Sequence, residues 1–377
     1  MKVSCALYVE IEAEEELLSL DWKALPQPVM VLGGGSNLLF TGDFPGTVLH
    51  MSLGLDQVQG SFGPGPILGT GPSPAGMASK GLKGTSGGPG PEVKIGPSPN
   101  VGWTRSKYEV DQVQFPKGCL VTVPANTVFD DFCAWAAAEG LWGPENLSLI
   151  PGECGASAVQ NIGAYGVEVK DILADIRAYD RVEGRFVHID PATCGYGYRT
   201  SKFKTEWKGR YIITAVTYRL SKEPRPILDY GGIRKALPDI PLTPQIIRDT
   251  IIGIRNQKLP DPAVTGSAGS FFCNPVISQE HFARIVEIAR QDNGPEYQVP
   301  HYVVGDQIKV PAAWMIEQCG FKGAVNGGAQ VYPRQPLVIV NASGEASPEE
   351  IIGLEERIID TIAGKYGITL HPEVEHI

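Results

Sequence analysis

Residues 145–171, ENLSLIPGECGASAVQNIGAYGVEVKD, are the stretch that decides the fold. Its central part is rich in small residues and carries few charges. Such a composition suits a loop and a short helix that pack closely against a flat ligand, where larger side chains would be in the way. A buried structural loop would have the same composition, so the residue types alone leave both interpretations open.

A second glycine-bearing segment lies upstream, where Gly33-Gly34-Gly35-Ser36-Asn37 follows the apolar run 29–32. The run predicts a short buried strand. Three adjacent glycines allow close approach of the backbone, and exposed N–H groups beside Ser36 and Asn37 would make an anion-binding nest. The pattern is neither GxGxxG nor GxxxxGK[ST], so it does not support a Rossmann site or a P-loop. An ordinary tight turn remains the alternative.

Composition excludes several classes of partner. With 32 Lys+Arg against 42 Asp+Glu, the formal net charge of the 377 residues is −10, which argues against nucleic acid or an anionic membrane as a primary partner. The seven cysteines are scattered without a CxxC and the six histidines do not cluster, so no metal site is expected. No apolar run is long enough to span a membrane, and the start lacks the features of a signal peptide, so we expect a cytoplasmic protein.

Glycine and proline concentrate in one part of the chain. Residues 54–102 hold 14 Gly and 8 Pro without a regular period. This composition is typical of low-complexity sequence that buries too little apolar surface to offset its chain entropy. It predicts a flexible insertion, whose return to ordered structure falls within 103–118.

Local signals elsewhere predict ordinary helices and strands. Alternation predicts strands over 174–189 and 210–220. Residues 127–140 predict an amphipathic helix. Thr243-Pro244 and Ser347-Pro348 each supply a cap followed by proline at the first position of a further helix. We interpret these elements as scaffold.

Two further segments concentrate reactive or charged side chains. Residues 194–204, CGYGYRTSKFK, interleave aromatic residues with arginine and lysine. This suits an anionic small molecule better than nucleic acid in so acidic a chain. Residues 266–275, GSAGSFFCNP, form a small-residue turn that leads into two aromatics. Ser270 is not in a GxSxG elbow and has no flanking His or Asp, so a serine-hydrolase role is poorly supported.

Together these segments resemble the UDP-N-acetylenolpyruvoylglucosamine reductase family over most of the chain outside the insertion. The matching motifs are VLGGGSNLLF (31–40), the 145–171 stretch, CGYGYRTSKFK (194–204), KLPDP (258–262), GSAGSFFCNPV (266–276), AAWMIEQCGFKGA (312–324) and HPEV (371–374). LDYGG and KLPDP resemble the longer of two family types, which has an extra tyrosine-bearing loop.

The resemblance implies an α+β fold with a two-subdomain FAD-binding module of the vanillyl-alcohol-oxidase (PCMH) type. A C-terminal α+β domain would bind the substrate. The implied division is 1–53 for the first FAD-binding subdomain, 54–118 for the Gly/Pro-rich insertion, 119–258 for the second subdomain and 259–377 for the substrate-binding domain.

The resemblance also implies a reaction. NADPH reduces FAD, and the reduced flavin then delivers hydride from N5 to the double bond of UDP-N-acetylglucosamine enolpyruvate, which gives UDP-N-acetylmuramate for peptidoglycan synthesis. The expected enzyme is a cytoplasmic monomer. Two other functions remain open: a non-catalytic relative with an impaired flavin site, and a flavin oxidase of the same superfamily that acts on a different alcohol.

Individual residues match the family's site. Arg199 matches the residue that stabilises developing negative charge, Glu373 its partner, and Ser270 the acid that protonates carbon. The implied cofactor-binding residues are Gly33, Gly34, Gly35, Ser36, Asn37, Pro151, Gly152, Gly155, Ala156, Ser157, Val159, Gly163 and Arg255. The implied substrate-binding residues are Tyr198, Tyr230, Lys258, Asn274, Tyr302, Lys322 and Gln335.

Overall fold

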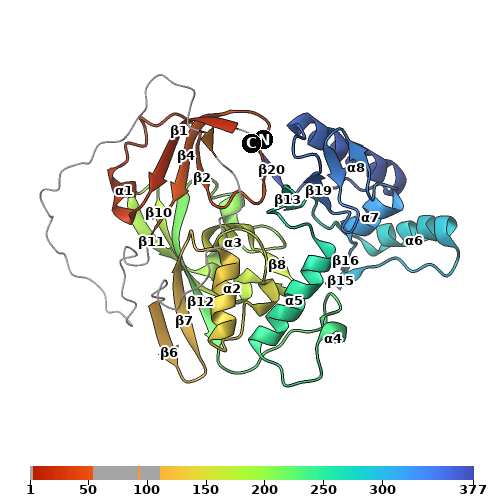
Figure 1. Ribbon diagram of the computed structural model, residues 1–377, viewed down its shortest axis with the longest axis horizontal. Helices are drawn as coiled ribbons and strands as arrows, with labels where there is room; N and C mark the ends of the chain where they lie inside the picture. Colours follow the sequence, from red (N-terminus) through yellow and green to blue (C-terminus); the bar gives the residue numbers. More distant parts are fainter. Residues whose placement is uncertain (1–2, 54–91, 94–110) are drawn as a thin grey trace, which may run out of the picture.

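The described part of the chain forms three groups of sheets and helices (Figure 1). The structure is a computed structural model that describes residues 3–53, 92–93 and 111–377. In Figure 1 the first group is red, the second runs from orange to green below it, and the third is blue at the right. The flexible insertion expected over 54–102 lies outside the described residues, apart from 92–93.

The first group is built on a four-stranded sheet in the order β2-β4-β1-β5. Its elements are β1 (Val3–Ile11), α1 (Glu14–Ser19), β2 (Val29–Leu32), β4 (Phe44–Met51) and β5 (Glu92–Val93). Strands β1 and β2 pair with β4 in parallel. The strand expected over 29–32 is confirmed, but its expected burial is wrong. Val31 is 42% exposed, because β2 lies at the edge of this sheet.

The second group is built on a five-stranded antiparallel sheet in the order β11-β10-β12-β7-β6. The strands are β6 (Asp111–Phe115), β7 (Gly118–Pro124), β10 (Leu173–Asp180), β11 (Arg185–Ile189) and β12 (Tyr211–Ser221). Strand β6 lies within 103–118, the stretch in which the return to ordered structure was expected. Its residues pair with β7 in register, so ordered structure has begun by Asp111.

Helices and short elements pack on this sheet and connect it to the third group. They are α2 (Phe129–Ala138), η2 (Glu145–Leu147), α3 (Cys154–Gln160), β8 (Gly163–Ala164), β9 (Val167–Glu168), η3 (Val169–Asp171), η4 (Pro191–Thr193), η5 (Lys202–Lys204), α4 (Ile233–Ala236) and α5 (Pro244–Lys258). The expected cap of α5 is confirmed, since the Thr243 hydroxyl accepts from the Ile246 amide. The amphipathic helix expected over 127–140 is confirmed as α2, whose N-cap, Val128, makes no side-chain cap hydrogen bond.

The third group holds two small sheets, with orders β13-β19-β18-β17 and β14-β16-β15, and three helices. The elements are β13 (Ser267–Ser270), β14 (Val276–Ile277), α6 (Gln279–Asn293), β15 (Tyr302–Val304), β16 (Gln307–Lys309), α7 (Ala312–Gln318), β17 (Val325–Asn326), β18 (Ala329–Val331), β19 (Val338–Asn341) and α8 (Pro348–Tyr366). Helix α8 begins with the predicted capping box of Ser347 and Glu350. Except for Leu39, the buried cluster of this group comes from residues 271–374.

The end of the chain returns to the first group. Strand β20 (Glu375–His376) pairs in parallel with β3 (Leu38–Leu39), directly after the glycine loop. Val3 and Ile377 belong to one hydrophobic cluster, so the described start of the chain and its end lie in the same part of the fold. A separate buried cluster joins the first two sheets, because Ile11 and Leu49 share it with Tyr179 and Ile212.

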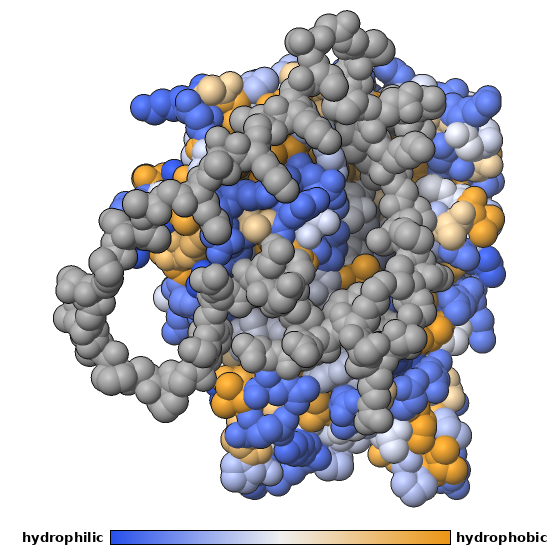
Figure 2. All heavy atoms as spheres, turned by 60° about the vertical axis from the view of Figure 1, so that its left-hand side comes forward, coloured by the Kyte–Doolittle hydropathy of each residue, from blue (hydrophilic) through white to orange (hydrophobic). Residues whose placement is uncertain are grey.

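The described surface is mostly polar on the face that Figure 2 shows. Hydrophilic residues spread over much of it, with smaller hydrophobic groups between them. Among the described residues, no helix is both long enough and apolar enough to cross a membrane.

Candidate active site

An ion pair between Arg199 and Glu373 joins two segments far apart in the sequence. Nε of Arg199 lies 2.9 Å from Oε1 of Glu373. The side chains are 20% and 11% exposed, so water screens their attraction less than it would on the surface. The structure thus brings together two of the three residues that the resemblance implies for catalysis.

The backbone at Arg199 is held in an unusual conformation. Its φ is 55°, which costs energy for a residue with a Cβ. Gly197 and Thr200 exchange backbone hydrogen bonds around it, and Asn161 Nδ2 donates to the Gly197 carbonyl at 2.7 Å. Nη2 of Arg199 donates to the Gly163 carbonyl at 2.6 Å. These contacts fix the direction of the guanidinium.

Glu373 is held by contacts from several segments. Gln160 Nε2 donates to its Oε1 at 3.2 Å, and Lys204 Nζ donates to the Gln160 side-chain oxygen at 2.9 Å. Asn37 Nδ2, in the glycine loop, donates to the Glu373 carbonyl at 3.0 Å. The Glu373 amide donates to the Phe271 carbonyl at 2.8 Å. The position of Glu373 therefore depends on all three groups of the fold.

Ser270 lies beside this pair along the backbone. It is the last residue of β13, and the next residue, Phe271, accepts the hydrogen bond from the Glu373 amide. Phe272 forms an antiparallel bridge with Pro372. The Ser270 hydroxyl is partly buried and makes no hydrogen bond with other described residues. It is therefore available to a ligand.

Aromatic rings and one lysine form a second part of the site, which we call the tyrosine cluster: Tyr198, Tyr230, Tyr302 and Lys309. Nζ of Lys309 lies 4.8 Å from the ring centroid of Tyr198 and 5.8 Å from that of Tyr302. Tyr230 stacks on Tyr302 with centroids 6.0 Å apart. Asn274 Nδ2 donates to the Tyr198 hydroxyl at 3.1 Å. Two predicted substrate-binding residues, Tyr198 and Tyr302, thus contact the cation, and two others, Tyr230 and Asn274, contact those tyrosines.

Lys309 is the residue that the sequence reasoning missed. It lies between Ile308 and Val310, which are buried, and this alternation in a strand was the available signal. Burial lowers the pKa of the Lys309 ammonium, and the charge of Arg199 adds to this effect while that of Glu168 opposes it. A partly desolvated cation among aromatic rings suits a phosphate ligand.

Three predicted substrate-binding residues do not join the tyrosine cluster through a contact between described residues. Lys258 is exposed at the last position of α5. Lys322 forms an ion pair with Glu317 at 2.7 Å. The side-chain oxygen of Gln335 accepts from the Leu337 amide at 3.5 Å. Their substrate contacts stay predictions.

The two glycine-bearing segments lie against each other. A Cβ at Gly33 would lie 3.0 Å from Oε2 of Glu153 and 3.8 Å from Cβ of Ala156. Gly152, at φ 109°, would place a Cβ 3.0 Å from the Ser36 hydroxyl. Side chains here would fill the space between the segments, so the glycines keep two stretches of backbone accessible at one place.

The predicted cofactor-binding residues of helix α3 point two ways: some face the protein interior and one faces outward. A Cβ at Gly155 would lie 2.7 Å from Cβ of Ala125, so this glycine permits close packing on the residue that follows β7. The Ser157 hydroxyl is buried, donates to the Cys154 carbonyl at 2.6 Å and lies 3.2 Å from the Tyr218 hydroxyl. The outward-facing side is left to Ala156, which is exposed. The remaining predicted residues, Gly34, Gly35, Pro151 and Val159, lie in the same two segments.

Arg255 carries a buried donor without a partner. Nη2 donates to the Leu149 carbonyl at 3.1 Å, but Nε is buried and unpaired among the described residues. Burial lowers the pKa of this guanidinium, and Tyr165 acts in the opposite direction. Buried polar groups are nearly always hydrogen-bonded, so this donor is free to bind a ligand or a water molecule.

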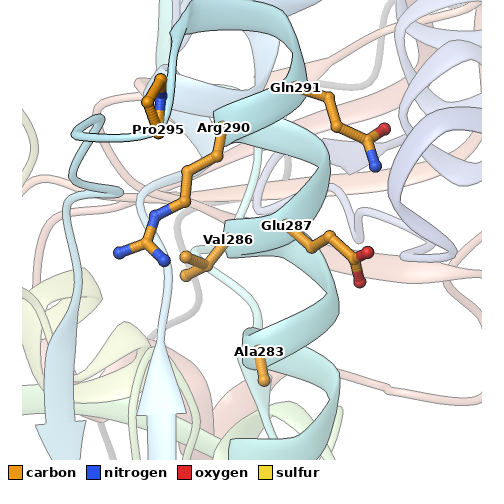
Figure 3. A pocket seen from close by; sticks show the side chains of 6 residues that line it. All are labelled: Ala283, Val286, Glu287, Arg290, Gln291 and Pro295. Carbon is orange, nitrogen blue, oxygen red and sulfur yellow. The ribbon is translucent and has the colours of Figure 1, made fainter.

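A surface hollow elsewhere is formed by α6 and the loop that follows it (Figure 3). It is lined by Ala283, Val286, Glu287, Arg290, Gln291 and Pro295. None of these residues takes part in the ion pair, the tyrosine cluster or the glycine segments. The hollow is therefore separate from the candidate site.

The fold and the site define an α+β enzyme for a large anionic ligand, because fixed cations and a backbone cradle converge where all three groups meet. Comparison with known proteins agrees. A family model described as UDP-N-acetylenolpyruvoylglucosamine reductase, C-terminal domain, matches residues 261–377.

Relatives extend the match to the whole chain. The UDP-N-acetylenolpyruvoylglucosamine reductase of Bacteroides fragilis (strain YCH46) is 38% identical over 378 residues, covering 100% of this chain and 95% of its own. That of Cupriavidus pinatubonensis is 37% identical over 96% of this chain and 91% of its own. The solved structure of MurB from Thermus caldophilus has a TM-score of 0.56 at 20% identity, covers 98% of this chain and 91% of its own, and so shows the fold alone.

The chain belongs to the UDP-N-acetylenolpyruvoylglucosamine reductase family. It is an oxidoreductase that carries out a reduction in the synthesis of peptidoglycan precursors, and hence in cell wall biogenesis. The comparisons give no support to the alternative of a non-catalytic relative.

Proposed function

We propose that this enzyme reduces UDP-N-acetylglucosamine enolpyruvate to UDP-N-acetylmuramate, with FAD as bound cofactor and NADPH as reductant. The observation that carries the proposal is the ion pair of Arg199 and Glu373 beside Ser270. It assembles a fixed cation and a free hydroxyl from distant parts of the chain.

The residues of the two glycine segments fit FAD. Gly33 to Asn37 and Gly152 would hold its diphosphate, because backbone N–H groups there can be approached closely. The unpaired Nε of Arg255 would face the flavin. When bound, FAD would supply hydride from flavin N5 after reduction by NADPH. Two FAD-binding subdomains, 1–53 and 119–258, would together hold the cofactor and would form a PCMH-type module.

Arg199 stabilises the negative charge that hydride addition builds next to the substrate carboxylate. A guanidinium fixed before the reaction lowers the barrier because it need not reorient as the charge develops. Glu373 orients that guanidinium, since its Oε1 lies 2.9 Å from Nε. Gly163 fixes the other side of the guanidinium through its carbonyl.

Ser270 donates the proton to carbon. Its hydroxyl is a weak acid, so transfer requires a developed negative charge on the acceptor carbon and a fixed position for the donor. The end of β13 provides that position, because the following residue pairs with Glu373. Acid and cation then act on the same end of the substrate.

The tyrosine cluster and Asn274 bind the UDP diphosphate. Lys309 supplies the charge, and Tyr198 and Tyr302 hold its ammonium between their rings. Lys258, Lys322 and Gln335 complete the substrate contacts from the 259–377 domain and its border. We place the reaction in the cytoplasm, with the enzyme as a monomer.

An anaerobic absorption trace of the purified protein tests the proposal. Bound flavin bands should bleach when NADPH is added and return when UDP-N-acetylglucosamine enolpyruvate follows. A protein that takes up no FAD on reconstitution would contradict the proposal and favour a non-catalytic relative. Rapid reoxidation by oxygen coupled to turnover of an alcohol would instead indicate a flavin oxidase.

A further inference from the structure

Glu153 lies where the two glycine segments meet, and the mechanism above does not use it. Its carboxyl lies against the glycine loop: Cβ atoms added at Gly33 and Gly34 would fall 3.0 Å from Oε2 and 3.9 Å from Oε1. The side chain is only partly exposed. A carboxyl group therefore lines the place proposed for the FAD diphosphate, where negative charge is unfavourable.

The described surroundings do not compensate this charge. No Lys, Arg or His among the described residues forms an ion pair with Glu153, and its carboxyl accepts no hydrogen bond from them. The loop 33–37 has no titratable side chain. From α3 the facing titratable group is the Cys154 thiol, whose pKa is raised by burial. From α2 the charged groups are Asp130, which pairs with Arg248, and Asp131, which also has an interaction partner.

We propose that Glu153 makes FAD binding proton-linked: the neutral carboxyl contacts the cofactor diphosphate, and the ionised carboxylate opposes binding. A protonated carboxyl has an O–H that can donate to a phosphate oxygen. An ionised one would place a like charge beside the diphosphate in a site of low dielectric. This inference rests on the proposed function, because it requires FAD in the glycine cradle.

The pKa of Glu153 supports this geometry. Burial raises it from 4.5 to about 8. The carboxyl is therefore mostly neutral at pH 7 and mostly charged at pH 9 in the free protein. Since FAD would bind the neutral form better, binding takes up a proton above the pKa, and the dissociation constant rises with pH.

The test is a titration of the full-length apoprotein with FAD from pH 6 to 9, followed by flavin fluorescence. For wild type, the dissociation constant should be nearly constant from pH 6 to 7 and rise about tenfold between pH 7 and 9, as expected for one linked proton. Glu153→Gln, which is always neutral, should change by less than about twofold over the same range and should bind more tightly than wild type at pH 9.

Glu139→Gln is the matched control, because Glu139 is an exposed carboxyl after α2. It should keep the wild-type slope. Flavin ionisation is common to all three proteins and cancels in the comparison. A second measurement on wild type alone uses calorimetry at pH 8.5 in two buffers of different ionisation enthalpy, where binding should take up most of one proton per FAD.

The outcomes separate the two claims. If wild type binds FAD with no pH slope and no proton uptake, this inference is wrong while the proposed function stands. The same holds if Glu153→Gln keeps the full slope. If wild type binds no FAD at any pH, the proposed function fails and the inference fails with it.

Discussion

Glu373 and Glu153 are two partly buried glutamates whose neighbours differ. Glu373 faces Arg199 and accepts from Gln160, whereas Glu153 faces a glycine loop and no described cation. The first environment places a carboxyl group where it orients a guanidinium. In the second, burial raises the pKa of Glu153 and favours the neutral carboxyl. The same residue type thus takes two roles, and the surrounding charges decide which.

Ser270→Ala should give the largest effect of the substitutions considered, a loss in the rate of flavin reoxidation. Ser270 lies beside the ion pair of Arg199 and Glu373. Loss of a general acid typically costs about 10²–10⁴-fold. Stopped-flow absorbance should show normal flavin reduction by NADPH and slow reoxidation by the enolpyruvyl substrate. Ser267→Ala, in the same strand, is the control and should reoxidise normally. Normal turnover by Ser270→Ala would remove this residue from the mechanism.

Glu373→Gln should follow, with reoxidation slower by about 10²-fold. The amide keeps the shape but loses the charge that orients Arg199, and misplaced electrostatic groups typically cost about 10²–10³-fold. The rate of flavin reoxidation is the measurement. Glu375→Gln changes an exposed carboxyl two residues away, which pairs with Lys208, and should react like wild type. Equal reoxidation rates for both variants would show that the reaction does not depend on the charge of Glu373.

Asn37→Ala tests whether the glycine loop, which faces Glu153, also positions Glu373. Its side chain lies in the glycine loop and donates to the Glu373 carbonyl at 3.0 Å. One such bond is worth about 0.5–1.5 kcal/mol, so reoxidation at saturating FAD should slow about two- to tenfold. Asn326→Ala removes a similar bond, to the Glu350 carbonyl at 2.7 Å, far from the loop, and should leave the rate unchanged. An unchanged rate in Asn37→Ala would show that the loop does not position Glu373.

Glu153→Gln should have the smallest effect, on the stability of the apoprotein. Because the folded pKa is raised from 4.5 to about 8, ionisation opposes folding, and wild type loses stability as the pH rises across this interval. The Tm of the variant should equal that of wild type at pH 4.5 and exceed it at pH 9 by about 1–2 °C for each 1 kcal/mol relieved, because the unfolding entropy of so long a chain is large. Scanning calorimetry checks this. A constant Tm difference at all pH values would contradict it.

Local sequence predicted the scaffold better than the site. Caps at Thr243 and Ser347 mark their helices because a cap depends on a few adjacent residues. Strand β6 was missed although its alternation is local, because it adjoins the Gly/Pro-rich stretch. The ion pair of Arg199 and Glu373 depends on tertiary contacts, so only the resemblance could suggest it.

Lys309 and Glu153 show the same limit. Lys309 lies in a three-residue strand, and its importance comes from rings that other segments bring to it. Glu153 stood inside a quoted motif, but only the structure shows that the glycine loop faces its carboxyl. In both cases the residue type was visible and its neighbours were not.

The pairing of β20 with β3 has a consequence for the order of assembly. Glu375 donates its amide to the Asn37 carbonyl, and Leu39 accepts from the Ile377 amide, so the two partners are separated by nearly the whole sequence. Contacts of such long sequence separation form slowly. During translation, the loop after β2 leaves the ribosome early, but β3 cannot pair until residues 375–377 have been synthesised. Glu373 reaches Arg199 in that same step, so a nascent chain cannot form this ion pair before residue 373 has been synthesised.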